Sequence, residues 1–111
     1  MAIRKKKFPD DPNGHVLRLM KEYGADFSKA RPVHFYLYFP NERDAQKAKD
    51  RLNNAEYDVD MDKSDYSGKW LCLATKILHP GYNTLTKISV SLEKLAAELN
   101  GNYDGWETML E

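Results

Sequence analysis

Cysteine is nearly absent from this 111-residue chain. Its single cysteine, Cys72, excludes an internal disulfide and any metal site built from several cysteines. The sequence also has no apolar run close to the roughly 20 residues that a membrane-spanning helix requires. The first residues, MAIRKKKFPDDPNG, are basic but have no apolar stretch after them, unlike a secretory signal. We therefore expect a cytoplasmic protein that does not act at a membrane.

An excess of charge of either sign is also missing, because 17 basic residues balance 17 acidic ones. Proteins that bind nucleic-acid backbones usually carry a basic surplus, so direct binding of nucleic acid is not favoured. The basic run at residues 4–7 is a local exception, which we interpret as part of a solvated tail over residues 1–9. Residues 10–111 are long enough for one hydrophobic core and too short for two, which predicts a single domain.

Sequence motifs for catalysis or cofactor binding are absent as well. There is no glycine-rich phosphate loop and no nucleophile elbow, and the three histidines lie far apart in the sequence. Asp58, Asp60 and Asp62 have the D-x-D-x-D spacing of a calcium loop but lack its central glycine and closing glutamate. Cys72 has no neighbouring base, so we expect a buried, unreactive thiol. We therefore expect no enzyme activity, no metal and no cofactor.

Apolar periodicity and helix- or strand-breaking residues predict a leading helix followed by six further elements. The expected segments are a helix from Asp10 to about Tyr23, strands over 33–39, 57–62, 70–78 and 102–106, and helices over about 42–53 and 85–99. After the leading helix, the order β-α-β-β-α-β predicts an α+β, ferredoxin-like fold. In that fold two helices cover one face of a four-stranded antiparallel sheet and leave the other face partly open.

The alternation of side chains along a strand assigns each strand residue to one of the two faces. The side chains expected to face the helices are Val33, Phe35, Leu37, Phe39, Tyr57, Val59, Met61, Leu71, Leu73, Thr75, Ile77 and Tyr103. Those expected on the open face are His34, Tyr36, Tyr38, Asp58, Asp60, Asp62, Trp70, Cys72, Ala74, Lys76, Asp104 and Trp106. The last strand is expected to pair with the first, so that Trp106 packs against it.

The open face would combine aromatic side chains with an acidic stripe. RNA-recognition modules have the same element order and stack bases on aromatic side chains of the sheet. The strand at 70–78, WLCLATKIL, lacks the Gly/aromatic signature of those modules, and the three aspartates would repel phosphates. Aromatic anchors with acidic neighbours instead fit a basic protein partner. A second interpretation is that the leading helix, the N-terminal segment or a second subunit covers these aromatics.

Four short motifs within residues 10–111 are similar to those of a known family. They are Y-G-A-D at 23–26, H-x-x-x-x-F-P-x-E-x-x-A at 34–45, E-Y-D-V at 56–59 and G-x-Y-D-G-W-x-T at 101–108. The last motif is the most specific of the four. Together they resemble the type B regulators of ribonuclease E activity, the RraB family of ribonuclease E inhibitors, over nearly the whole chain.

This resemblance implies a ferredoxin-like α+β fold and a non-enzymatic role. Members of the family bind endoribonuclease E and thereby slow RNA turnover. The candidate partner-binding residues are His34, Tyr36, Tyr38, Asp58, Asp60, Asp62, Trp70, Asp104 and Trp106. The alternative functions are a single-stranded RNA-binding module that uses the open face and a small-molecule receptor or enzyme with a pocket around His34 and Trp106. Assembly into a homo-oligomer is also left open.

Overall fold

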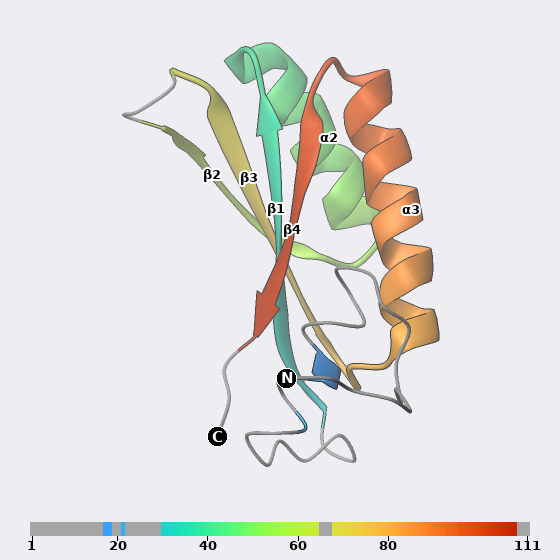
Figure 1. The fold of residues 1–111 in the computed structure, drawn as a ribbon. Coiled ribbons are helices and arrows are strands. Elements are labelled where there is room, and N and C mark those ends of the chain that lie inside the picture. Colours follow the sequence, from blue (N-terminus) through green and yellow to red (C-terminus); the bar gives the residue numbers. More distant parts are fainter. Residues whose placement is uncertain (1–16, 19–20, 22–29, 65–67, 109–111) are drawn as a thin grey trace.

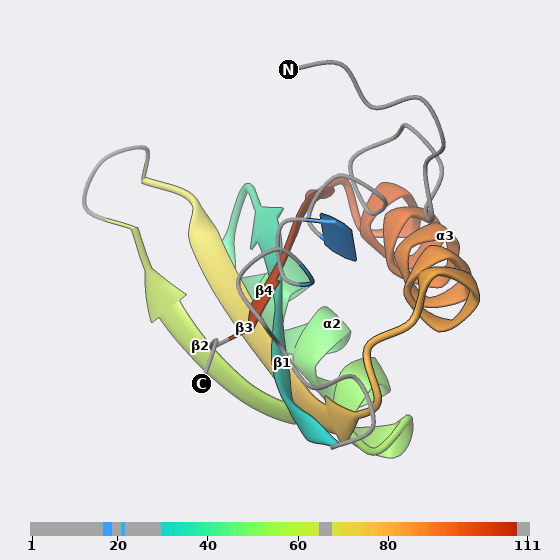
Figure 2. The ribbon, with the colours of Figure 1, turned by 60° about the horizontal axis from the view of Figure 1, so that its bottom comes forward.

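The computed structural model describes residues 17, 18, 21, 30–64 and 68–108, and its elements are labelled in Figure 1. In chain order they are β1 (Arg31–Phe39), α2 (Glu42–Asn54), β2 (Asp58–Lys63), β3 (Trp70–Leu78), α3 (Tyr82–Glu98) and β4 (Asn102–Thr108). The strands form one antiparallel sheet in the order β2-β3-β1-β4. Both helices lie on the same face of this sheet (Figure 2). The prediction of an α+β fold with a four-stranded antiparallel sheet and two helices is confirmed.

The predicted leading helix and basic tail lie almost entirely outside the described residues. From the predicted helix, the structure describes Leu17, Arg18 and Lys21, which are all helical. Leu17 has no exposed surface and belongs to the hydrophobic core. This segment therefore adds at least one side chain to the core that the sheet and the two later helices build.

Strand β1 forms the centre of the sheet, because it pairs with β3 on one side and with β4 on the other. Pro40, directly after the strand, ends it, since proline cannot donate a ladder hydrogen bond. Along the strand, buried side chains alternate with half-exposed ones. The fully buried set that faces the helices is Val33, Phe35, Leu37 and Phe39, as predicted.

Helix α2 begins at Asn41, whose side-chain oxygen accepts a hydrogen bond of 2.8 Å from the backbone N–H of Asp44. Its buried stripe is Ala45, Ala48 and Leu52, as predicted. Two of these three side chains are only a methyl group, so the helix backbone can approach the sheet closely. The buried Cys72 thiol of β3 accordingly reaches the carbonyl oxygen of Ala45 at 3.3 Å.

Helix α3 packs on β4 and β1, on the same face of the sheet as α2. It buries Leu85, Leu92 and Ala96, which come from the apolar repeat in the sequence. Arg51 of α2 and Glu98 of α3 form an ion pair of 2.9 Å between the two helices. Both side chains are nearly half exposed, so this pair contributes less than about 1 kcal/mol to stability.

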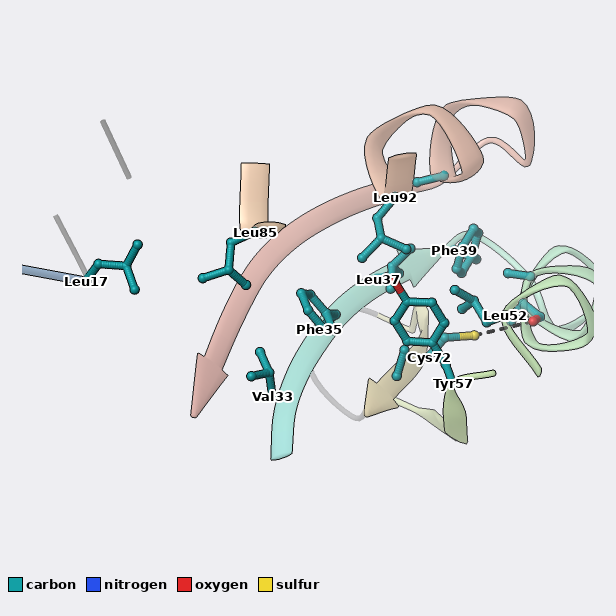
Figure 3. Close-up of a cluster of buried hydrophobic side chains, with 14 residues drawn as sticks. Leu17, Val33, Phe35, Leu37, Phe39, Leu52, Tyr57, Cys72, Leu85 and Leu92 are labelled. Carbon is teal, nitrogen blue, oxygen red and sulfur yellow. Dashed lines mark hydrogen bonds between the residues drawn. The ribbon is translucent and has the colours of Figure 1, made fainter. Parts of the chain in front are cut away.

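The core lies between the sheet and the two helices, and Figure 3 shows its largest side chains. Tyr57, directly before β2, is buried as predicted and meets the Phe35 ring edge to face, with ring centroids 5.9 Å apart. Such an aromatic pair stabilises a fold by about 0.5–1.5 kcal/mol beyond the area that it buries. This contact joins the central strand to the connection between α2 and β2.

The two faces of β3 are the reverse of those predicted. Cys72 and Ala74 are fully buried beneath the helices, whereas Ile77 is 70% exposed. The register explains this, because directly opposed residues share a face and β1 places Phe35 opposite Ala74 and Leu37 opposite Cys72. The predictions of Leu71, Leu73, Thr75 and Ile77 on the helix face and of Trp70, Cys72, Ala74 and Lys76 on the open face are therefore wrong. The positions below α2 need small side chains, which Cys72 and Ala74 provide.

Strand β4 pairs with β1 as predicted, but a β-bulge changes the face of its last residues. Tyr103 lies opposite Leu37, and Gly105 lies opposite Tyr36, so that Asp104 is the extra residue. Trp106 consequently lies opposite Phe35 on the helix side, where it packs against the core. The prediction that Trp106 packs against the first strand is confirmed, and its placement on the open face is wrong.

Gly101, between α3 and β4, has no room for a side chain. A Cβ at this position would overlap the Phe39 ring and the backbone oxygen of Tyr38, whereas a Cβ at Gly81 would meet nothing within 4 Å. We expect Gly101→Ala to lower the free energy of unfolding by about 1–3 kcal/mol and Gly81→Ala to change it little. Urea unfolding of the two variants measures this difference, and equal midpoints would contradict the close packing at Gly101.

Candidate protein-binding surface

The open face of the sheet is organised as three rows that cross all four strands. From β2 to β4 the rows are Asp58–Thr75–His34–Glu107, Asp60–Leu73–Tyr36–Gly105 and Asp62–Leu71–Tyr38–Asn102. Three of the strands each supply mainly one kind of side chain: β2 gives carboxylates, β3 gives mainly leucines, and β1 gives aromatic rings. Strand β4 is mixed, with Glu107, Gly105 and Asn102. Both described helices lie on the opposite face of the sheet (Figure 2).

The middle of the open face is partly exposed and largely apolar. Tyr36, Tyr38, Leu71 and Leu73 are all half-buried, because each is flanked by side chains of the neighbouring strands. Beyond these rows, Ile77 lies at the end of β3 opposite Pro32 and is 70% exposed. Apolar side chains that are already partly dehydrated and held by a rigid sheet are suitable anchors for a protein partner.

The edge of the open face along β2 carries three exposed carboxylates. Asp58, Asp60 and Asp62 alternate along the strand, as the sequence predicts. The carboxylate of Asp62 accepts a hydrogen bond of 2.9 Å from the backbone N–H of Lys63. Within residues 30–64 and 68–108, no described ion pair neutralises any of the three. This edge therefore keeps a negative potential that attracts basic groups.

Tyr36 is tied to the opposite edge of the open face. Its Cα partner on β4 is Gly105, and its hydroxyl donates a hydrogen bond to the carboxylate of Glu107, two residues further along. Gly105, at φ 114°, has no side chain in the path of the tyrosine. The hydrogen bond to Glu107, followed by burial and by the Glu107 charge, raises the pKa of Tyr36 to about 12. The bulge and the glycine thus fix the direction of this tyrosine.

His34 is also held by its neighbour in the same row. Its Nδ1 lies 2.8 Å from the hydroxyl oxygen of Thr75 on β3. This contact orients the imidazole ring across the sheet, towards β3, so His34 takes part in the structure of the surface. Of the other candidate residues, Asp104 is exposed in the bulge of β4.

The structure does not bring all the candidate residues together. Trp70 and Trp106 both pack against the core on the helix side and so leave the surface, while His34, Tyr36 and Tyr38 remain on it. Sequence reasoning missed the three apolar side chains of β3 that replace the tryptophans. They are Leu71, Leu73 and Ile77. Knowledge of the register between β1 and β3 would have found them, because they are opposite Tyr38, Tyr36 and Pro32.

A shallow depression of about 410 Å³ lies at the Ile77 end of the open face. It is lined by Pro32, Glu56, Asp58, Thr75, Lys76 and Ile77. The Lys76 ammonium turns to the helix side, where it donates to the carbonyl oxygen of Ala55 at 3.0 Å and lies over the Tyr57 ring. Neither His34 nor Trp106, the residues around which the receptor hypothesis places a pocket, lines this depression.

The described residues contain neither a cluster of metal ligands nor a membrane-spanning helix. Within residues 17, 18, 21, 30–64 and 68–108, no group of three His, Cys, Asp or Glu side chains could hold a metal ion. In the same residues, no helix has both the length and the apolar character needed to cross a membrane. The arrangement of the open face is that of a binding surface with an apolar middle and carboxylates on both edges.

The chain was compared with known protein families and with curated proteins. Residues 10–108 match the model of a family described as "Regulator of ribonuclease activity B". The match spans every described strand and both helices of the sheet. The search of curated proteins gives no match.

The Tyr36–Glu107 hydrogen bond can be tested by titration. We expect Glu107→Gln to lower the pKa of Tyr36 from about 12 towards the ordinary value of 10.0, because the negative acceptor is removed. In the native protein the raised pKa favours the folded state below pH 10, and this contribution is lost as the pH rises towards 12. NMR titration of ring-labelled tyrosine in the wild type and the variant measures the shift. An unchanged Tyr36 pKa in the variant would exclude this hydrogen bond.

The buried cysteine gives a second test of the surface assignment. Burial raises the pKa of Cys72 to about 11, and the Lys49 charge opposes this only partly. We expect the native thiol to react with an aromatic disulfide reagent at pH 8 only as fast as the protein opens, and rapidly once the chain is denatured. Fast reaction of the folded protein would place Cys72 on the open face after all.

Proposed function

The chain belongs to the family of regulators of ribonuclease activity B, and on this basis we propose that it regulates endoribonuclease E by binding the enzyme through the open face of the sheet. Regulation then results from occupation of a segment of the nuclease and not from catalysis by this chain. The family match carries the proposal, and the open face gives it a surface. We also propose that the fold is classified as ferredoxin-like, on the order of its elements.

The composition of the open face supports a protein as the bound partner. Half-buried Tyr38, Leu71 and Leu73 can be buried further at a small cost in side-chain entropy, since neighbouring strands already restrict them. The carboxylates of Asp58, Asp60 and Asp62 surround this apolar area on one side and can attract basic residues of the nuclease. Charges of this kind increase the association rate and select the partner more than they increase affinity.

Single-stranded RNA binding by the same face is less well supported. Trp70 and Trp106 are on the helix side, and the Tyr36 hydroxyl is held by Glu107, which leaves fewer rings for stacking. Carboxylates on β2 and β4 flank the remaining rings and would repel a phosphate backbone. We therefore propose a protein partner and treat RNA binding as an outcome that the same experiments can detect.

The proposal predicts an effect of the β2 carboxylates on the nuclease. We expect the wild-type chain to lower the cleavage rate of endoribonuclease E, and the triple variant Asp58→Asn, Asp60→Asn, Asp62→Asn to bind it about tenfold more weakly. The loss should lie mainly in the association rate and should shrink as salt is raised, because the charges act at long range. Surface-based kinetics at two salt concentrations, together with a cleavage assay, measure both effects.

A matched control carries the same change of charge on the helix face. The variant Glu42→Gln, Asp50→Asn, Glu93→Gln removes three carboxylates from exposed positions of α2 and α3. We expect it to bind the nuclease as the wild type does. Equal losses in the two triple variants would show a general charge effect, and an unchanged cleavage rate with the wild-type chain would refute the proposed function.

A further inference from the structure

Strand β2 is an edge of the sheet, and among the described strands it pairs only with β3. The backbone groups that point away from β3 follow from the alternation of an antiparallel pair. Ser64 donates to the carbonyl oxygen of Lys69 at 2.7 Å, so Ser64 is bonded across the hairpin. Because the direction of the backbone groups alternates along a strand, Asp62, Asp60 and Asp58 direct their backbone N–H groups towards β3, as Ser64 does. Val59, Met61 and Lys63 direct their N–H groups away from β3. These three form the outer edge of β2.

Part of this outer edge is available to another strand. The backbone N–H of Lys63 donates a hydrogen bond of 2.9 Å to the carboxylate of Asp62. The N–H groups of Val59 and Met61 have no such partner among the described residues. The side chains of Val59 and Met61 point to the helix face, where they are partly buried against the core. The edge therefore offers backbone donors and acceptors above an apolar lining.

The side chains of β2 determine which strand could use this edge. A second copy of β2 would place its own aspartates beside Asp58, Asp60 and Asp62, and like charges at adjacent strand positions are destabilising. The edge is thereby protected against pairing with copies of itself. A strand with basic residues at alternate positions would instead form a favourable cross-strand pair with each of the three aspartates.

We infer that β2 accepts an extended, basic segment of the partner as a fifth, antiparallel strand of the sheet. Its basic side chains lie on the open face beside the three aspartates, and its intervening apolar side chains lie beside Val59 and Met61. The backbone hydrogen bonds give affinity, and the alternation of charge selects the sequence. The inference rests on the proposed function for the identity of the partner and adds the form in which that partner is recognised.

Two peptides of equal composition test the added strand on the full chain. The first, acetyl-Lys-Val-Lys-Val-Lys-amide, has the alternation that β2 requires, and the second, acetyl-Lys-Lys-Lys-Val-Val-amide, does not. From three cross-strand charge pairs we expect the first to bind about tenfold more tightly. NMR titration gives the affinities, and hydrogen exchange should show protection of the Val59 and Met61 amides by the first peptide only.

A methylated peptide and two triple variants of the protein separate strand addition from simple charge attraction. Methylation of both valine amides of the first peptide removes the donors that face β2, and we expect this to reduce binding about tenfold although its charge is unchanged. The triple variant of Asp58, Asp60 and Asp62 should lose the preference for the first peptide. The triple variant of Glu42, Asp50 and Glu93 on the helix face should keep it.

Equal affinity for the two peptides, or equal binding after methylation, overturns the added strand. Absence of exchange protection at Val59 and Met61 overturns it as well. If the chain still regulates the nuclease in that case, the proposed function stands with a different contact. If the peptide adds to β2 but the chain has no effect on the nuclease, the inference stands and the proposed function fails.

Discussion

The pairing of β1 on both of its sides is the constraint from which the rest of the structure follows. One face of this strand is fully buried under α2 and α3, so its register with β3 and β4 cannot shift without exposing the buried side chains. That register determines which residues of β3 and β4 reach the open face. The composition of the surface proposed for binding thus depends on the buried side chains of β1, which lie on the other face of the sheet and do not contact a partner.

On the open face, the residues suited to give affinity and those suited to give selectivity lie on different strands. Apolar and aromatic side chains occupy its central strands, and carboxylates occupy its two edges. The central rings are themselves restrained, Tyr36 by Glu107 and His34 by Thr75. A surface with fixed side chains loses little entropy on binding, which favours recognition of a partner that matches the spacing of the charges.

The sequence predicts the parts of the fold in which one face is apolar and the other is not. The alternation in β1 and the aspartates of β2 are of this kind, and both were assigned correctly. In β3 both faces contain apolar residues, so the pattern alone could not show that Cys72 and Ala74 lie under α2. In β4 the bulge at Asp104 inserts one residue and moves Trp106 to the helix side, because side chains alternate with a period of two. A bulge of this kind depends on the partner strand, which local sequence does not contain.

The pairing of β1 with β4 has a consequence for how the protein is made. It joins Val33 to Thr108, so the two strands that must meet are separated in the sequence by α2, β2, β3 and α3. Contacts between such distant segments carry a large loop-closure entropy and form slowly. During synthesis one edge of β1 therefore stays unpaired until β4 has left the ribosome. The four-stranded sheet can therefore form only after the chain has been translated through Thr108.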